Sequence, residues 1–547
     1  MYTLIIIGAL LCYFYGLIVL YIRKKYREKI NKELTEFKYK CVKKWEKYGE
    51  PITKLPSDEW SERELICLIN KYSSIVRNNI KNKHLSGTVY GDVLRNETFT
   101  DLVPTIDTNG IFSKLRRIYT YAYEQSYLWN PLHNDEFGIC AFIDYQIIQI
   151  VGHMFGSEED CKSISGFVTS GGTESLMNAV RSYRNWAIET KGHKIGKSVI
   201  LASDMIHAAV IKAGRAYNVN IVLIKSNKGK IDLDDLSNNL FYYGNKVAAI
   251  FVSGPCYPLG VIDPIERVSY LAKKHGCGLH VDCCLGGFIV NFLPTKKKSS
   301  KYLSLEGVTS LSVDTHKNGF APKGSSILIT KHIGDKYLSY YSVYSIPEWS
   351  GGVYGTPKDA GSQSAVNSLT TLLALLAVGE DKYAYFANEI NLKTYQLANI
   401  INKFPGKLTL VVEPEVNVVA FKIDPNWKLN KGAIYAYAYE MSKRGFVLNA
   451  LAKEIVHYCV TMRFVNDKDA LCNFYKATEE SLLEVSRLNM TGTKFPGDAG
   501  IYCALEEALN PKVENNITKY IENVLFGKKA ANDVVRCHFS ALLNPYD

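Results

Sequence analysis

The sequence predicts an α/β protein with a large domain on a mostly parallel sheet, a smaller α/β domain after it, and a transmembrane helix before it. Short apolar runs alternate with helical patterns between about residues 163 and 330, as in parallel sheets covered by helices. New helix and strand patterns begin after residue 384, and the N-terminal segment is apolar and uncharged. At 547 residues the chain is also too long for one ordinary domain.

The N-terminal segment reads MYTLIIIGALLCYFYGLIVLYI and has no charged side chain from Tyr2 to Ile22. About 20 apolar residues at ~1.5 Å each span a hydrocarbon core of ~30 Å, so residues 1–22 are expected to form a membrane anchor. A cleaved signal peptide would need a basic start, a shorter apolar run and a small-residue cleavage site, which this segment lacks. The basic stretch RKKYREKINK follows, so the positive-inside rule predicts a cytosolic location for the remaining chain.

The rest of the chain divides into three expected parts. Residues 23–100 form a basic juxtamembrane and N-terminal segment, residues 101–383 the large domain, and residues 384–547 the smaller domain. The large domain is expected to contain the strands SVILAS, VNIVLI, KVAAIFVS, GCGLHVD and VTSLSVD. In a parallel sheet of this kind ligands bind at the carboxyl ends of the strands, which is where the functional residues should lie.

Composition restricts the possible partners and cofactors. The formal net charge of +11 makes an anionic partner plausible, although much of the excess lies just after the apolar N-terminus. The 13 cysteines include no C-x-x-C pair, and the adjacent Cys283 and Cys284 suit neither a zinc ribbon nor a disulfide framework. Reduced thiols in a cytosol-facing protein are therefore expected, without a metal site or a nucleic-acid partner.

The first motif that indicates chemistry is TSGGTESLMNAV, in which Gly171, Gly172 and Thr173 precede a helical pattern. Free N–H groups at a helix N-terminus bind anions, and glycine lets a phosphate approach closely. The motif is not a P-loop because the G-K-[ST] ending is missing, and it also lacks G-x-G-x-x-G. A simple glycine turn with an N-cap is the alternative interpretation.

Two further motifs end strands with charged residues. LHVDCCLGGF places Asp282 at the end of an apolar strand, where a buried carboxylate needs a cation or hydrogen-bond donors. SLSVDTHKNGFAPKGSS places His316 and Lys317 after the next strand. The alternatives are a satisfied core aspartate and a surface lysine in a loop.

One cofactor accounts for all three motifs. Pyridoxal phosphate needs a phosphate cradle, an acid that keeps its ring nitrogen protonated, and a lysine that bonds to its aldehyde. His207, in DMIHAAVIKA, adds a flat ring that could stack on the cofactor. The expected cofactor-binding residues within one subunit are Gly171, Gly172, Thr173, His207, Asp282, His316 and Lys317, with Lys317 also catalytic.

The order of the motifs TSGGTES, IHAA, HVDCCLGGF, DTHKNGFAPKGSS and SGGVYGTP resembles the pyridoxal-phosphate-dependent group II decarboxylase family. The resemblance runs from about residue 90 to about residue 379, and more loosely to the C-terminus. Within the family, NPLHND, GVIDP, APKGSS and the apolar N-terminus are similar to the branch that cleaves phosphorylated long-chain bases, rather than to soluble amino-acid decarboxylases.

The resemblance implies a homodimer of fold type I with active sites at the subunit interface, held in the endoplasmic reticulum membrane. It implies cleavage of the C2–C3 bond of a phosphorylated sphingoid base to a fatty aldehyde and phosphoethanolamine. Gly352 and Thr356 would reach the partner's cofactor phosphate, and Tyr90, His133 and Lys323 would be catalytic residues on the substrate side. An amino-acid decarboxylase on the same scaffold and a membrane-tethered pseudoenzyme are the alternatives.

The chain departs from the family pattern at three positions. Gln363 stands where the family often has the arginine of G-S-R-P-G, Cys283 where alanine is usual, and Leu259 where histidine is common. Because an arginine fork binds phosphate or carboxylate far better than an amide does, the first departure leaves open how the anionic end of the substrate is held.

Overall fold

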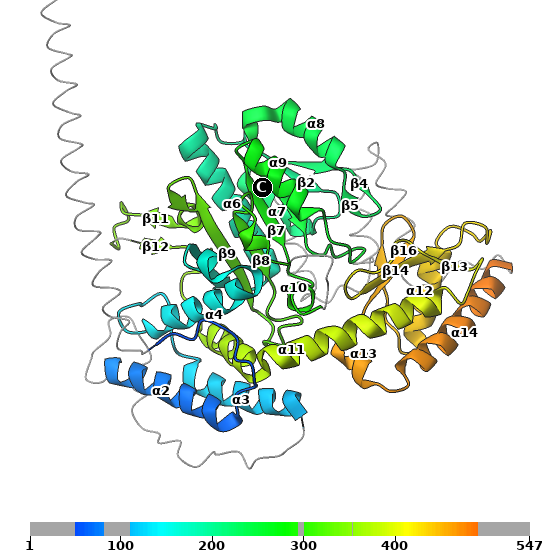
Figure 1. Ribbon diagram of the computed structural model, residues 1–547, viewed down its shortest axis with the longest axis horizontal. Coiled ribbons are helices and arrows are strands. Elements are labelled where there is room, and N and C mark those ends of the chain that lie inside the picture. The colour runs from blue at the N-terminus through cyan, green and yellow to red at the C-terminus, as the bar shows by residue number, and fades with distance from the viewer. Residues whose placement is uncertain (1–49, 81–109, 294–299, 353, 491–547) are drawn as a thin grey trace, which may run out of the picture.

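The computed structural model describes residues 50–80, 110–293, 300–352 and 354–490 (Figure 1). The predicted anchor at residues 1–22, the basic residues that follow it, and Tyr90 lie outside this part of the chain. Among the described residues, no helix combines the length and the apolar character needed to cross a membrane.

An eight-stranded sheet forms the centre of the large domain. Its strands run in the order β1-β9-β8-β7-β6-β2-β3, and β10 pairs with β9. The neighbours from β8 to β3 are parallel, whereas β9 is antiparallel to both β1 and β8, so the predicted mostly parallel sheet is confirmed. The strands are β1 (Ile164–Thr169), β2 (Val199–Ser203), β3 (Asn220–Ile224), β6 (Val247–Ser253), β7 (Gly278–Asp282), β8 (Ser310–Val313), β9 (Ser326–Ile333) and β10 (Lys336–Tyr337).

Helices cover both faces of this sheet, which explains why its strands are continuous apolar runs. Ile200 and Ala202 of β2 pack with α6 and α7, while Val199 and Leu201 face the core shared with α4, α8 and α9. The main helices before the small domain are α2 (Glu62–Ile80), α3 (Gly110–Ser126), α4 (Ile139–Phe155), α6 (Gly172–Lys191), α7 (Ala208–Tyr217), α8 (Leu233–Tyr243) and α9 (Ile265–Lys274).

Shorter elements complete the large domain. A hairpin of β11 and β12 stands apart from the main sheet and projects from the side of the domain away from the small domain (Figure 1). The shorter elements are α5 (Glu158–Cys161), β4 (Ser226–Asn227), β5 (Lys230–Ile231), α10 (Gly287–Val290), β11 (Tyr344–Ile346) and β12 (Tyr354–Thr356).

Helix α11 (Val366–Ile401) joins the large domain to the small one and bends at Gly379, where φ is 71°. The backbone of Asp58 and Glu59 packs against the bend, and a Cβ on Gly379 would lie 3.1 Å from the Asp58 backbone. Glycine is required there because the positive φ and the close backbone both disfavour a side chain. The predicted domain boundary between residues 383 and 384 falls inside this helix, just beyond the bend.

The small domain contains a four-stranded sheet in the order β13-β14-β16-β15, in which all neighbours are antiparallel. Helices α12 and α14 pack on one another beside it, so the described part of this domain contains both helices and strands. Its elements are β13 (Leu408–Leu410), β14 (Val418–Ile423), α12 (Ala433–Lys443), β15 (Asn449–Leu451), β16 (Ile455–Cys459), α13 (Met462–Asn466) and α14 (Ala470–Met490).

Candidate active site

A pocket of about 370 Å³ lies at the carboxyl ends of the central strands. Each predicted residue in it follows a strand of the large sheet: the glycines follow β1, His207 follows β2, Asp282 ends β7, and Lys317 comes after β8. All seven residues predicted to bind the cofactor within one subunit line this pocket, namely Gly171, Gly172, Thr173, His207, Asp282, His316 and Lys317.

The glycine motif forms a cradle at the start of α6. Gly171 has a φ of 153°, and no side chain caps the helix there, so the first N–H groups keep their capacity to bind an anion. A Cβ on Gly172 would lie 2.8 Å from Asp314 Oδ1 and 3.0 Å from Cys284 Sγ. Side chains at these positions would fill the cradle, so the residues present fit a phosphate group.

Asp282 is 6% exposed and borders the pocket. The backbone N–H of Cys284 donates to its Oδ1 at 3.0 Å, and the Ser312 hydroxyl donates to the same oxygen at 3.4 Å. Both donors are neutral, and no salt bridge to Asp282 exists within the described residues. The carboxylate is therefore suited to a cationic partner in the pocket, such as a protonated ring nitrogen.

Lys317 is held by a carboxylate that the sequence analysis did not single out. Its Nζ lies 2.9 Å from Asp314 Oδ2, and His316 Nε2 lies 3.3 Å from the same oxygen. The backbone N–H of Ser325 donates to His316 Nδ1 at 3.0 Å, which places a proton of this histidine on Nε2, facing Asp314. Asp314 thus orients both the lysine and the histidine of the motif.

The charges of this cluster alter its pKa values. Burial would raise the pKa of Asp314, but the hydrogen bond from His316 and the charge of Lys317 outweigh it and hold the pKa well below the usual range. Burial would likewise lower the pKa of Lys317, but the Asp314 carboxylate raises it above the ordinary value. Without cofactor, Lys317 is therefore an ammonium group paired with Asp314, and it must lose a proton before its nitrogen can bond to an aldehyde.

The opposite wall of the pocket depends on the small domain. His207 caps α7, and its Nδ1 accepts the N–H of Ala209 at 3.1 Å, so the neutral ring carries its proton on Nε2. The ring of Tyr257, which also lines the pocket, lies edge-on to His207 at 6.4 Å and to His457 of β16 at 4.8 Å. His457 Nδ1 donates to the Pro258 carbonyl at 2.8 Å, which ties this wall to the small-domain sheet.

The other predicted residues that lie within the described part of the chain do not line this pocket. His133, Lys323 and Gly352 are exposed, and Thr356 is buried at the end of β12, where its hydroxyl bonds to the carbonyls of Lys358 and Ala360. The structure therefore separates the predicted site into the pocket and a second group, which consists of His133, Lys323, Gly352 and Thr356.

Hydrogen bonds connect the chain segments that carry the second group. The Ala365 N–H donates to the Trp129 carbonyl at 3.0 Å, and the Asn130 amide donates to the Ser362 hydroxyl at 3.2 Å. The Asn367 amide donates to the Gly324 carbonyl at 2.8 Å. The segments around His133, Gln363 and Lys323 are thus fastened to each other at the start of α11.

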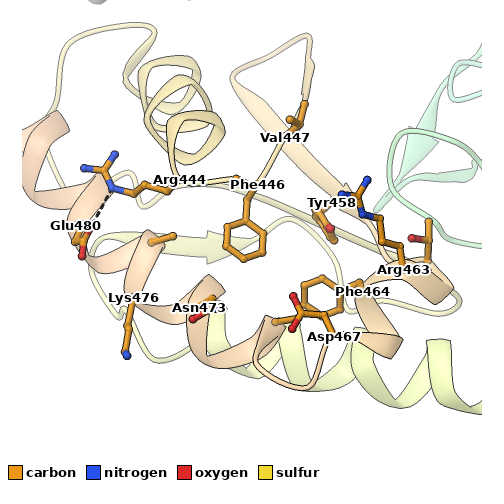
Figure 2. Close-up of a pocket in the computed structure, with 14 residues that line it drawn as sticks. Arg444, Phe446, Val447, Tyr458, Arg463, Phe464, Asp467, Asn473, Lys476 and Glu480 are labelled. Atoms are coloured by element: carbon orange, nitrogen blue, oxygen red, sulfur yellow. Dashed lines mark hydrogen bonds and ion pairs between the residues drawn. The ribbon is translucent and has the colours of Figure 1, made fainter.

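A larger pocket, of about 710 Å³, lies in the small domain (Figure 2). The rings of Phe446, Tyr458 and Phe464 point into it, and Arg444 pairs with Glu480 at its edge. It contains none of the predicted site residues. Size alone would therefore misplace the active site, whereas the residues at the strand ends locate it.

Residues 130–424 match the pyridoxal-dependent decarboxylase conserved domain. The chain is 31% identical to sphingosine-1-phosphate lyase 1 of Rattus norvegicus over 426 residues, which cover 76% of this chain and 70% of the relative. The chain belongs to the sphingosine-1-phosphate lyase family. It is also 30% identical to the Saccharomyces cerevisiae lyase over 440 residues, or 78% of this chain and 68% of the relative. The predicted family and its cofactor, pyridoxal phosphate, are confirmed.

Solved structures support the fold assignment. The sphingosine-1-phosphate lyase of Burkholderia pseudomallei superposes with a TM-score of 0.63 at 23% identity, covering 82% of this chain and 96% of that one. The glutamate decarboxylase of Lactobacillus brevis superposes with a TM-score of 0.57 at 16% identity, covering 68% and 86%. At these sequence identities the likeness shows the decarboxylase-type fold but does not identify the substrate.

Proposed function

We propose that the chain is an aldehyde-lyase that cleaves the C2–C3 bond of phosphorylated sphingoid bases such as sphingosine 1-phosphate, releasing a fatty aldehyde and phosphoethanolamine. One observation carries the proposal. In a member of the sphingosine-1-phosphate lyase family, Lys317, Asp282 and His207 meet the glycine cradle in a single pocket.

Each pocket residue has a role toward the cofactor. The N–H groups of residues 171–173 would hold the phosphate, the ring of His207 would lie against the cofactor ring, and Lys317 would bond to its aldehyde carbon. When bound, pyridoxal phosphate supplies an electron-poor ring that accepts the electron pair left on C2. Asp282 maintains that property by keeping a proton on the ring nitrogen, for which its neutral hydrogen-bond donors leave it available.

Asp314 controls the proton on Lys317. Whenever Lys317 is not bonded to the cofactor, its Nζ lies within hydrogen-bond distance of Asp314 Oδ2, which would stabilise its ammonium form. From there Lys317 can deliver a proton to C2 after the aldehyde has left. A separate base must take the proton from the C3 hydroxyl.

The base and the contacts to the substrate phosphate come from the second group of a partner subunit. This assignment makes the protein a homodimer, in which His133 and Lys323 face the partner's pocket and Gly352 and Thr356 reach the partner's cofactor phosphate. Exposure of His133, Lys323 and Gly352, away from their own pocket, supports it. Tyr90 is assigned to the same substrate side from the family motif.

The enzyme is anchored in the endoplasmic reticulum membrane by one helix at residues 1–22, with the catalytic domain in the cytosol. The apolar run and its basic flank support this topology. The chain has three glycosylation acceptor triplets, which would remain unmodified in the cytosol: Asn96-Glu97-Thr98, Asn489-Met490-Thr491 and Asn516-Ile517-Thr518. The test is to express the full-length chain in eukaryotic cells and treat it with a deglycosylating enzyme. A mobility shift would show that the catalytic domain lies in the lumen and would contradict the proposed orientation.

Product analysis tests the activity. The full-length protein, loaded with pyridoxal phosphate, is incubated with sphingosine 1-phosphate, and the expected products are a fatty aldehyde and phosphoethanolamine in equal amounts. Release of CO₂ from amino acids, without aldehyde, would instead identify a decarboxylase. A protein that takes up no cofactor and shows no visible absorbance would be a pseudoenzyme.

A further inference from the structure

The hairpin arm, defined as β11, β12 and the loop between them, carries Gly352 and Thr356. Its strands pair only with each other, with Tyr344 opposite Thr356 and Ile346 opposite Tyr354. Residues 347–352 of its loop are exposed, and Trp349 is 54% exposed. Because no strand of the main sheet pairs with it, the direction of the arm depends on contacts at its base.

Arg181 of α6 holds both ends of that base. Its guanidinium forms an ion pair with Asp359 and donates to the Pro357 carbonyl at 3.0 Å, and both partners follow β12. The guanidinium carbon also lies 4.1 Å from the centre of the Tyr344 ring, at the start of β11. One side chain therefore contacts the arm where it leaves the domain and where it returns.

The burial of Arg181 shows that these contacts are specific. Its side chain is 1% exposed, and a buried cation is costly unless it is paired and hydrogen-bonded. Besides Asp359 and Pro357, the guanidinium donates to Asn178 Oδ1 at 2.5 Å. The planar guanidinium reaches these partners with several donors in a fixed geometry, which the single ammonium centre of a lysine does not reproduce.

The two helices that present cofactor residues also hold the arm. Helix α6 begins with Gly172 in the cradle and carries Arg181 further along. Helix α7 begins after His207 and ends at Tyr217, whose hydroxyl donates to Asp359 at 3.2 Å. The cradle, the stacking histidine and the base of the arm are thus linked by two rigid elements.

We propose that Arg181 is a positioning residue that sets the arm relative to its own pocket, so that in the dimer the arm meets the partner's cofactor site. The proposal rests on the lyase function and the dimer proposed above. Its distinctive consequence is that damage at Arg181 impairs the partner's active site rather than the site of its own chain.

The first test compares Arg181→Lys with Arg117→Lys. Arg117 pairs with Glu62 at 2.7 Å between α3 and α2, away from the arm, and is the matched control. Arg181→Lys should lower kcat on the order of 100-fold, the effect of a misplacement of about 1 Å, while the cofactor absorbance remains. In the cofactor-free protein, chymotrypsin should cut the arm faster in this variant alone.

A second, more conservative variant tests the same contact with less risk of misfolding. Tyr344→Phe removes only the hydroxyl that donates to Asp359 at 3.2 Å, so kcat should fall less than in Arg181→Lys and melting should be unchanged. Equal arm cleavage in Arg181→Lys and wild type would overturn the proposal. This protease measurement needs no substrate, so it also distinguishes failure of the proposal from failure of the assigned lyase activity.

Mixed dimers supply the decisive test. Arg181→Lys chains, which have an intact pocket, are co-expressed with Lys317→Ala chains, which have an intact arm, and tagged heterodimers are isolated. One of their two sites then combines an intact pocket with an intact arm, so activity should reappear although both parent dimers are impaired. Heterodimers no more active than the Arg181→Lys parent, or a protein that sediments as a monomer, would overturn the proposal.

Discussion

The pocket around Lys317 and the second group around His133 differ in how completely one chain builds them. In the pocket, Asp314 and Asp282 are buried, His316 is half-buried, and all three are hydrogen-bonded or paired with neighbours in the same chain. In the second group, His133 and Lys323 are exposed and do not line the pocket. A single chain therefore assembles the pocket around Lys317, whereas the second group would act on a pocket only in the proposed dimer.

Lys317→Ala should abolish the function of the pocket and have the largest effect. Because no other amine lines the pocket within the described residues, both turnover and the visible absorbance of bound cofactor should disappear. Borohydride reduction of wild type followed by peptide mapping should place the pyridoxyl group on Lys317. A label on Lys323 would contradict the assignment and reverse the roles of the two regions.

His133→Ala should lower turnover without affecting cofactor binding, and so distinguish the second group from the pocket. Turnover should fall by about 100-fold or more if this histidine moves a proton in the partner's site, whereas cofactor absorbance should stay at the wild-type level. The measurement is kcat beside the visible spectrum of the same preparation. Loss of cofactor in this variant would show that His133 takes part in cofactor binding and would contradict its assignment to proton transfer.

Asp314→Asn should change the pH dependence of cofactor attachment to the pocket. The Asp314 carboxylate raises the pKa of Lys317, so its removal lowers that pKa and leaves more free amine at a given pH. The rate at which cofactor-free protein attaches pyridoxal phosphate, followed by absorbance, should reach its midpoint at a lower pH than in wild type. An unchanged midpoint would mean that Asp314 does not set the protonation of Lys317.

His457→Phe should have the smallest effect. The ring contact with Tyr257 is kept, but the Pro258 carbonyl loses its donor, so the free energy of unfolding should fall by about 1–3 kcal/mol in urea titrations. Burial lowers the pKa of His457 below 6.5, so wild type loses stability as the pH falls through that value, because the unfolded chain binds the proton. The phenylalanine variant lacks this loss, and the difference between the two proteins should narrow in acid.

The central sheet and the pocket could be predicted because their determinants are local. Parallel strands buried on both faces are continuous apolar runs, and the functional residues follow directly at the strand ends. The glycines before α6, Asp282 at the end of β7 and Lys317 after β8 all lie where the sequence placed them.

Long-range contacts could not be predicted in the same way. The rings of Tyr257 and His457 are in contact although they lie some two hundred residues apart in the sequence. No pattern in either segment predicts this contact. Arg181 has the sequence context of an ordinary helical arginine, and its burial depends on how the hairpin arm folds back. Asp314 could have been predicted, because it lies only three residues before Lys317 in the same motif.

The bend at Gly379 gives the described N-terminal residues a mechanical role. The Glu380 N–H donates to the Pro56 carbonyl at 3.0 Å, and the Trp60 N–H donates to the Leu376 carbonyl at 3.1 Å. Residues 56–60, here called the strap, are therefore hydrogen-bonded to the connecting helix on both sides of its bend. A force applied through the preceding chain would reach the joint between the domains before it reached either core. A truncated, detergent-free version of the enzyme should therefore begin no later than residue 50, so that the strap stays in place.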